Sequence, residues 1–211
     1  MFPRYTRAEQ RADRCIHLTG VPLGGLGLAA ILATAPGRGA TAPAIGLLVY
    51  GCALVAMLAC SALYNLTPPS PRKALLRRLD HAAIFIMIAG TYTPFLLIPM
   101  RSAATDRLLA WVWAAAIAGA AAKLLRPQRL ERLSVAFYLL LGWSFLLILD
   151  EMLAALPRPA LLLLAAGGLL YTAGAAFHLL DRLPYHNAVW HALVLAAAAC
   201  HYAAIMGYVA S

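Results

Sequence analysis

Seven long apolar stretches, separated by short connectors, constrain this chain more than any other feature. They run over residues 18–35, 44–66, 81–100, 108–124, 135–149, 161–180 and 188–210. About 20 predominantly apolar residues in a helix cross the hydrocarbon core of a bilayer. Of the 211 residues, 63% are hydrophobic and only 12% are charged, which excludes an ordinary soluble domain. We predict an all-α membrane protein, a single domain over residues 1–211 that forms a seven-transmembrane helix bundle.

The connectors between these stretches are short and rich in residues that end helices. Residues 36–39 read Pro-Gly-Arg-Gly, and residues 67–71 read Thr-Pro-Pro-Ser-Pro. Such segments favour turns and are too short to fold independently. We therefore expect consecutive helices to be antiparallel neighbours.

The basic residues are sorted between alternate connectors. The chain carries a net charge of +9, which in a soluble protein would suggest a nucleic-acid partner. Thirteen of the 17 Lys and Arg residues fall on one side of the predicted bundle, and only Arg38, Arg101, Arg107 and Arg158 fall on the other. Because basic residues favour the cytoplasmic side, we predict a cytoplasmic N-terminus and an outside C-terminus. The expected partner is membrane lipid, with no nucleic acid, in a bacterial inner (plasma) membrane.

Polar residues gather at the predicted cytoplasmic ends of the second, third and seventh stretches. These residues are Ser61, Asn65, Asp80, His81, Asn187 and His191. Polar groups at one depth of a membrane protein indicate a functional site, here one able to hold a metal with an activated water. A cluster hydrogen-bonded between helices explains the same pattern, and spacing leaves both interpretations open. Asp80 also suits the first turn of a helix that begins near residue 81.

We expect the remaining histidines to lie outside this polar cluster. His201 lies ten residues beyond His191, roughly 15 Å along a helix, so we expect it to satisfy an interhelical hydrogen bond instead of joining the site. His17, His178 and His186 flank predicted spans, where an interfacial imidazole is the ordinary interpretation.

Three blocks of the chain resemble the bacterial hemolysin III family, which is related to the progestin and adiponectin receptor (PAQR) family. The second stretch contains Ser-Ala-Leu-Tyr-Asn at 61–65, and the third contains Leu-Asp-His at 79–81 with Gly-Thr-Tyr-Thr-Pro at 90–94. The seventh contains Asn-Ala-Val-Trp-His at 187–191, followed by His-Tyr at 201–202. The resemblance covers nearly the whole chain and implies seven helices with a cytoplasmic N-terminus.

The resemblance also implies a zinc site, from which this chain departs at two positions. Family members carry Ser-x-x-x-His and His-x-x-x-His in these blocks, and the three histidines resemble zinc ligands. Ser61 and Asp80 match the residues that position the metal-bound water, and His191 matches one ligand, while Asn65 and Asn187 stand at the other two positions. A neutral amide is a poor zinc ligand beside an imidazole. We therefore favour an interhelical amide network over a reworked zinc site, with zinc still a candidate cofactor.

Three functional hypotheses follow. The first is a hemolysin III-like membrane protein that binds or senses lipid, or supports membrane homeostasis, without a standard zinc site. The alternative implied by the resemblance is a zinc-dependent intramembrane amide hydrolase, ceramidase-like, that acts on lipids. A pore-forming cytolytic protein ranks last, because seven mostly apolar helices offer no lining for an aqueous channel.

Overall fold

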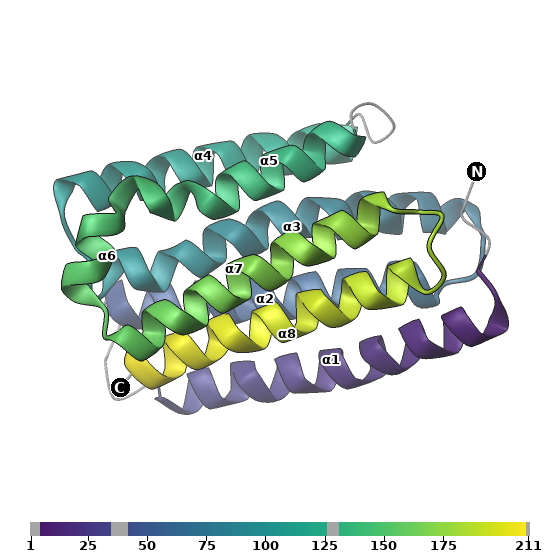
Figure 1. Ribbon diagram of the computed structural model, residues 1–211, viewed down its shortest axis with the longest axis horizontal. Coiled ribbons are helices and arrows are strands. Elements are labelled where there is room, and N and C mark those ends of the chain that lie inside the picture. Colours follow the sequence, from purple (N-terminus) through teal and green to yellow (C-terminus); the bar gives the residue numbers. More distant parts are fainter. Residues whose placement is uncertain (1–4, 35–41, 126–130, 210–211) are drawn as a thin grey trace.

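The chain forms only helices in the part that the structure, a computed structural model, describes: residues 5–34, 42–125 and 131–209. Figure 1 labels the helices in chain order. They are α1 (Arg7–Thr34), α2 (Ala42–Leu66), α3 (Pro71–Leu97), α4 (Ala103–Leu125), α5 (Glu131–Trp143), the 3₁₀ helix η2 (Ser144–Ile148), α6 (Leu149–Ala155), α7 (Arg158–Leu179) and α8 (His186–Tyr208). The predicted connector at 36–39 lies outside these residues, as do the basic residues Arg4, Arg38, Arg126 and Arg129.

Seven helices among the described residues are long and apolar enough to cross a membrane, which confirms the predicted count. Six of them are α1, α2, α3, α4, α7 and α8, and the seventh span, Leu133–Ala155, is made by α5, η2 and α6 together. The chain is therefore a multi-pass membrane protein. Which side of the membrane receives the N-terminus stays a prediction from the charges.

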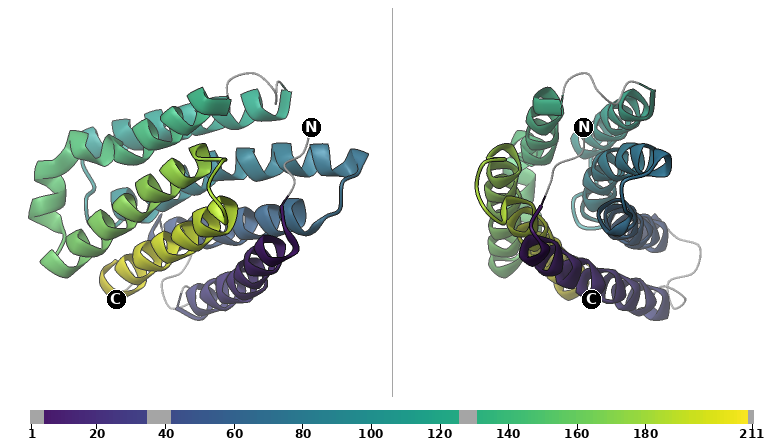
Figure 2. Two further views of the ribbon diagram at one scale, coloured as in Figure 1. Left: turned by 45° about the vertical axis from the view of Figure 1, so that its right-hand side comes forward. Right: turned by 90° about the vertical axis from the view of Figure 1, so that its right-hand side faces the viewer.

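The helices follow one another around a ring (Figure 2, right). Consecutive helices pack side by side, and α1 also packs against α8, so the first and last helices close the ring. We call the end at which α1, α3, α5 and α8 begin the amino end of the bundle (Figure 1, right-hand side). The starts of α1 and α8 and the junction between α2 and α3 meet there.

Helix α3 is the most enclosed of the seven spans, with 72% of its most apolar window buried. It packs against α2, α4, α5 and α8. Gly90 allows α2 to approach closely: a Cβ there would lie 2.7 Å from the Cβ of Ala53 on α2. The short Gly-Thr-Tyr-Thr-Pro block predicted from the sequence is therefore a packing segment at the centre of the bundle.

The start of α3 corrects the sequence prediction. The helix begins at Pro71, not near residue 81, and Ser70 caps it by accepting a hydrogen bond from the backbone N–H of Lys73 at 3.3 Å. Proline is favoured in the first turn, where its missing N–H is not needed. Asp80 consequently lies inside the helix, so its interpretation as a capping or first-turn acid was wrong. Hydropathy detects the apolar part of the helix, whereas the helix itself begins ten residues earlier than expected, at Pro71.

The fifth span is not the single helix expected over 135–149. Its α-helix ends at Trp143 and continues as the 3₁₀ helix η2 before α6 begins at Leu149. The hydroxyl of Tyr92 on α3 lies 2.8 Å from the carbonyl oxygens of both Leu141 and Gly142, and accepts from the backbone N–H of Phe145 at 2.9 Å. Because backbone groups inside a membrane must find partners within the protein, this tyrosine stabilises the break.

Candidate functional site

A cavity of about 920 Å³ opens at the amino end of the bundle. Side chains of α1, α2, α3, α4, α5, α7 and α8 line it. Its wall includes apolar residues such as Met57, Leu58 and Val194 as well as many charged and polar ones. A cavity of this size and mixed lining is typical of a binding site for a small molecule or a head group.

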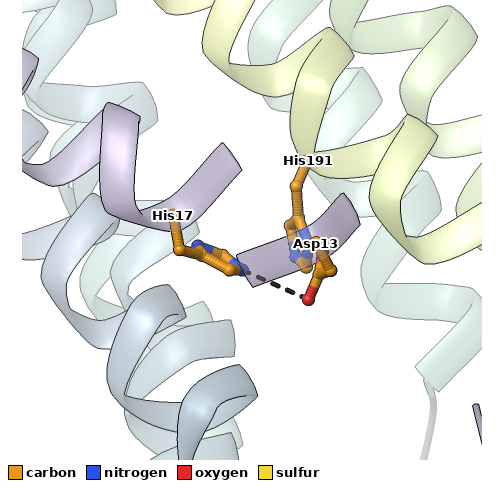
Figure 3. A group of neighbouring side chains, drawn as sticks. All are labelled: Asp13, His17 and His191. Atoms are coloured by element: carbon orange, nitrogen blue, oxygen red, sulfur yellow. Dashed lines mark hydrogen bonds and ion pairs between the residues drawn. The ribbon is translucent and has the colours of Figure 1, made fainter. Parts of the chain in front are cut away.

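The most tightly grouped ionisable residues in this cavity are Asp13, His17 and His191 (Figure 3). Nδ1 of His191 donates a hydrogen bond to Oδ1 of Asp13 at 2.5 Å, and Nε2 of His17 lies 3.5 Å from Oδ2 of Asp13. The two imidazole rings are 4.5 Å apart between centroids. All three residues are at most 8% exposed, so one carboxylate is shared by two imidazoles away from bulk solvent.

Helix α1 presents Asp13 and His17 on the same face, because residues four apart lie one above the other on a helix. Its start is fixed by a capping box, in which Thr6 donates its backbone N–H to the Glu9 carboxylate at 2.8 Å and Glu9 donates to Oγ1 of Thr6 at 3.3 Å. The other carboxylate oxygen of Glu9 accepts from the backbone N–H of Tyr185, just before α8, at 2.9 Å. This link holds the starts of α1 and α8 together and sets Asp13 and His191 at the same depth.

The two asparagines predicted to replace imidazoles form an amide network around His191. Nδ2 of Asn187 donates to Oδ1 of Asn65 at 3.4 Å. Nδ2 of Asn65 donates to the carbonyl oxygen of Ser61 at 2.9 Å and lies 3.5 Å from Nε2 of His191. An amide N–H₂ group therefore faces the ring nitrogen that a metal at the family position would need. The donor set at that position does not fit the zinc that the resemblance implies.

Ser61 and Asp80 form a second pair in the same cavity. The Ser61 hydroxyl hydrogen-bonds the carboxylate of Asp80, which is also close enough to His191 and Asp13 to interact with them electrostatically. Asp80 is only 8% exposed. The pair places a hydroxyl and a carboxylate beside the imidazole cluster, which is an arrangement able to bind and orient a polar group of a ligand.

All six polar residues that the sequence gathered at this end line the cavity. They are Ser61, Asn65, Asp80, His81, Asn187 and His191. The backbone carbonyl of His81 accepts from the Tyr138 hydroxyl at 2.9 Å, which links α3 to α5 beneath the cavity. The catalytic or metal-binding roles of these residues stay predictions.

His201, which we expected to satisfy an interhelical hydrogen bond instead of joining the site, does not line the cavity. Its Nε2 is 3.3 Å from the carbonyl oxygen of Leu164 on α7, and its ring packs against Tyr171 with centroids 5.5 Å apart. Gly167 leaves the room for this imidazole, since a Cβ there would come within 2.4 Å of the ring. His201 thus serves the α7–α8 contact.

Sequence reasoning missed Asp13 and His17 as site residues. His17 was expected to be an interfacial imidazole, and Asp13 was not singled out. The available signal was their spacing of four residues at the entrance of an apolar helix, the same spacing that singled out Asn187 and His191. What the sequence did not indicate is that α1 packs against α8.

Comparisons with known proteins give consistent results. The model of the family described as haemolysin-III related matches residues 6–202. The hemolysin-3 homolog of Bacillus subtilis (strain 168) is 31% identical over 204 residues, which cover 97% of this chain and 96% of that protein. Hemolysin-3 of Bacillus cereus is 34% identical over 202 residues, covering 95% and 92%. No solved structure matches.

A more distant relative comes from animals. The monocyte to macrophage differentiation factor of Homo sapiens, a PAQR-family protein, is 30% identical over 168 residues, which cover 76% of this chain and 68% of that protein.

Proposed function

The chain belongs to the haemolysin-III family, and from this premise we propose that it binds the polar head group of a bilayer lipid in the cavity at the amino end. The observation that carries this proposal is the cavity itself. It encloses about 920 Å³ among helices that are long and apolar enough to cross a membrane. Its charged rim suits a head group, and its apolar wall of Met57, Leu58 and Val194 suits the first part of an acyl chain.

The charges around the cavity favour a lipid that carries phosphate. Six basic residues line it, namely Arg7, Arg11, Arg14, Lys73, Arg77 and Lys123, against the four acids Glu9, Asp13, Asp80 and Asp181. Arginine and lysine bind phosphate through charge-assisted hydrogen bonds. With the cytoplasmic orientation predicted from the sequence, the lipid would enter from the inner leaflet.

A matched pair of double variants tests this proposal. Arg11→Gln with Arg14→Gln removes two exposed charges at the cavity, whereas Arg101→Gln with Arg107→Gln removes two exposed charges at the opposite end. We expect the first variant to retain an anionic phospholipid about 30-fold less well, because each of the two basic residues near an anionic head group contributes about 1 kcal/mol. Native mass spectrometry of protein from nanodiscs of mixed anionic and zwitterionic lipid measures the retention. Equal retention by both variants would contradict the proposal.

A second candidate function is hydrolysis of a lipid amide, favoured by the Ser61 and Asp80 pair beside His191. In such a reaction Ser61 would hold the attacking water while Asp80 takes its proton, and the resulting hydroxide would add to the amide carbonyl. Asp80 would then return the proton to the leaving amine as the C–N bond breaks. Release of fatty acid from a fluorescent N-acyl sphingosine, abolished in the Asp80→Asn variant, would support it. If release persists in that variant, or if the unaltered protein releases no fatty acid, hydrolysis by this pair is contradicted and lipid binding is the only proposed function that stands.

A further inference from the structure

We infer that Asp13, His17 and His191 form a binding site for a divalent transition metal, with zinc as the best-fitting ion. Only His191 belongs to the ligand set implied by the family resemblance, and the other two ligands come from α1. The site goes beyond the proposed lipid binding, because either property can fail without the other. Such a site would explain why His17 and Asp13 lie beside His191 in a chain that has asparagine at the two other expected ligand positions.

The strongest observation is the state of His17. Its side chain is only 5% exposed, and within the described residues its Nε2 has no hydrogen bond and only a long ion-pair contact with Oδ2 of Asp13, at 3.5 Å (Figure 3). A buried polar atom without a full hydrogen bond is costly, and an ion bound between the two side chains would relieve that cost.

The spacing of the three residues also suits a metal. One ligand atom from each lies within 4.8 Å of the other two. Ligands of a tetrahedral zinc ion, each about 2.1 Å from the metal, stand about 3.4 Å apart. Nε2 of His17 lies 3.5 Å from Oδ2 of Asp13, and Nδ1 of His191 lies 2.5 Å from the other oxygen, Oδ1. An ion held by both imidazoles and one of these oxygens therefore needs the Asp13 carboxylate to turn and its contact with His191 to open.

The chemistry of the ligands points to zinc or a similar ion. Two imidazoles and one carboxylate form a common three-ligand set for zinc, whereas calcium and magnesium prefer oxygen ligands. In this arrangement the ion replaces the proton that His191 donates to Asp13. Asp80 lies near the same imidazole and lines the same cavity.

The test uses the full-length, tag-free protein in nanodiscs, stripped with a chelator and titrated with Zn²⁺ against a chromophoric competitor. We expect one tightly bound equivalent, and a rise in the melting temperature when zinc is added. His17→Gln and Asp13→Asn should each weaken binding at least about 100-fold, since even an outer partner of a metal ligand is worth about 10- to 100-fold. Co²⁺ in place of zinc should give visible bands of a four-coordinate site that both variants lose.

A control variant separates this site from its neighbours. His186→Gln removes a buried imidazole that lines the same cavity but lies outside the cluster. It should bind zinc within about threefold of the unaltered protein, well short of the effect of losing a ligand. If it weakens binding as much as His17→Gln does, the ion sits elsewhere and the inference is wrong.

Two further results would overturn the inference, and the first of them needs no variant. One is an unaltered protein that shows neither a zinc-dependent melting shift nor cobalt bands. The other is zinc bound equally well by a folded His17→Gln protein. Lipid retention that still depends on Arg11 and Arg14 in either case would leave the proposed function standing.

Discussion

Helix α3 carries polar side chains into two regions that use them in opposite ways. Near the amino end, Asp80 faces a cavity lined by ionisable groups of other helices. Tyr92 lies further along the same helix and is only 1% exposed. Its ring stacks on Phe145 with 3.7 Å between the centroids, and its hydroxyl hydrogen-bonds the backbone of the broken fifth span. In the first region the polar groups face a cavity that can hold a ligand, whereas in the second they hydrogen-bond the protein's own backbone.

The two regions differ in whether their polar side chains already have hydrogen-bond partners inside the bundle. Thr91 and Thr93 donate to carbonyls one turn earlier in α3, at 2.9 and 2.8 Å, and Thr93 also accepts from Nε1 of Trp113. The hydroxyl groups of both threonines therefore have hydrogen-bond partners within the bundle. Substitutions should therefore reduce stability most in the second region and least around Asp80.

The largest loss of stability is expected for Gly90→Leu. A Cβ at Gly90 would lie 2.7 Å from the Cβ of Ala53, so a larger side chain must push α2 and α3 apart. We expect a loss of about 3 kcal/mol in the free energy of unfolding, the upper part of the range for overpacking. Thermal unfolding in nanodiscs measures it. Gly25→Leu is the matched control, because nothing lies within 4 Å of a Cβ there; similar losses in both would refute the packing argument.

A smaller loss is expected for Tyr92→Phe, which keeps the ring and removes only the hydroxyl. The backbone N–H of Phe145 then loses its partner, and the Tyr92 contact with Ser144 Oγ at 2.9 Å disappears. An unsatisfied buried group costs about 1–3 kcal/mol, so we expect about 2 kcal/mol from the same unfolding measurement. Tyr208→Phe, at a partly exposed position near the end of α8, should change stability little. A harmless Tyr92→Phe would mean that η2 forms without this tyrosine.

The smallest effect on stability is expected for Asp80→Asn. An amide of the same size can still bond to Ser61, and removing a buried charge relieves desolvation. We expect the free energy of unfolding to change by less than about 1 kcal/mol. If Asp80→Asn destabilises as much as Tyr92→Phe, the two regions are not different in kind, and Asp80 is a structural residue.

The sequence predicted most of the fold because hydropathy and connector length report directly on membrane spans. It also gathered Ser61, Asp80 and His191 at one end, since antiparallel topology alone brings those helix ends together. The start of α3 escaped prediction because residues 71–80 contain four basic residues and one acid and are nevertheless helical. Hydropathy measures affinity for the bilayer, not helix formation, and the Ser-Pro cap signal was overlooked.

The part of the site on α1 was not predictable in the same way. Asp13 and His17 matter only because α1 packs against α8, a contact between helices at opposite ends of the chain. No periodicity within one helix reveals its distant neighbour. The break after Trp143 was hidden for the same reason, because Tyr92 supplies its stabilising bonds from another helix.

The contact between Asp13 and His191 spans 178 residues of chain, and this has a consequence for how the protein is made. Helices enter a membrane as the chain is synthesised, so α1 inserts long before α8 exists. Until the last helix docks, Asp13 and His17 have no His191, and the ring remains open along one side. The binding region is thus completed by the final step of assembly, and a chain that stalls earlier carries only half of it.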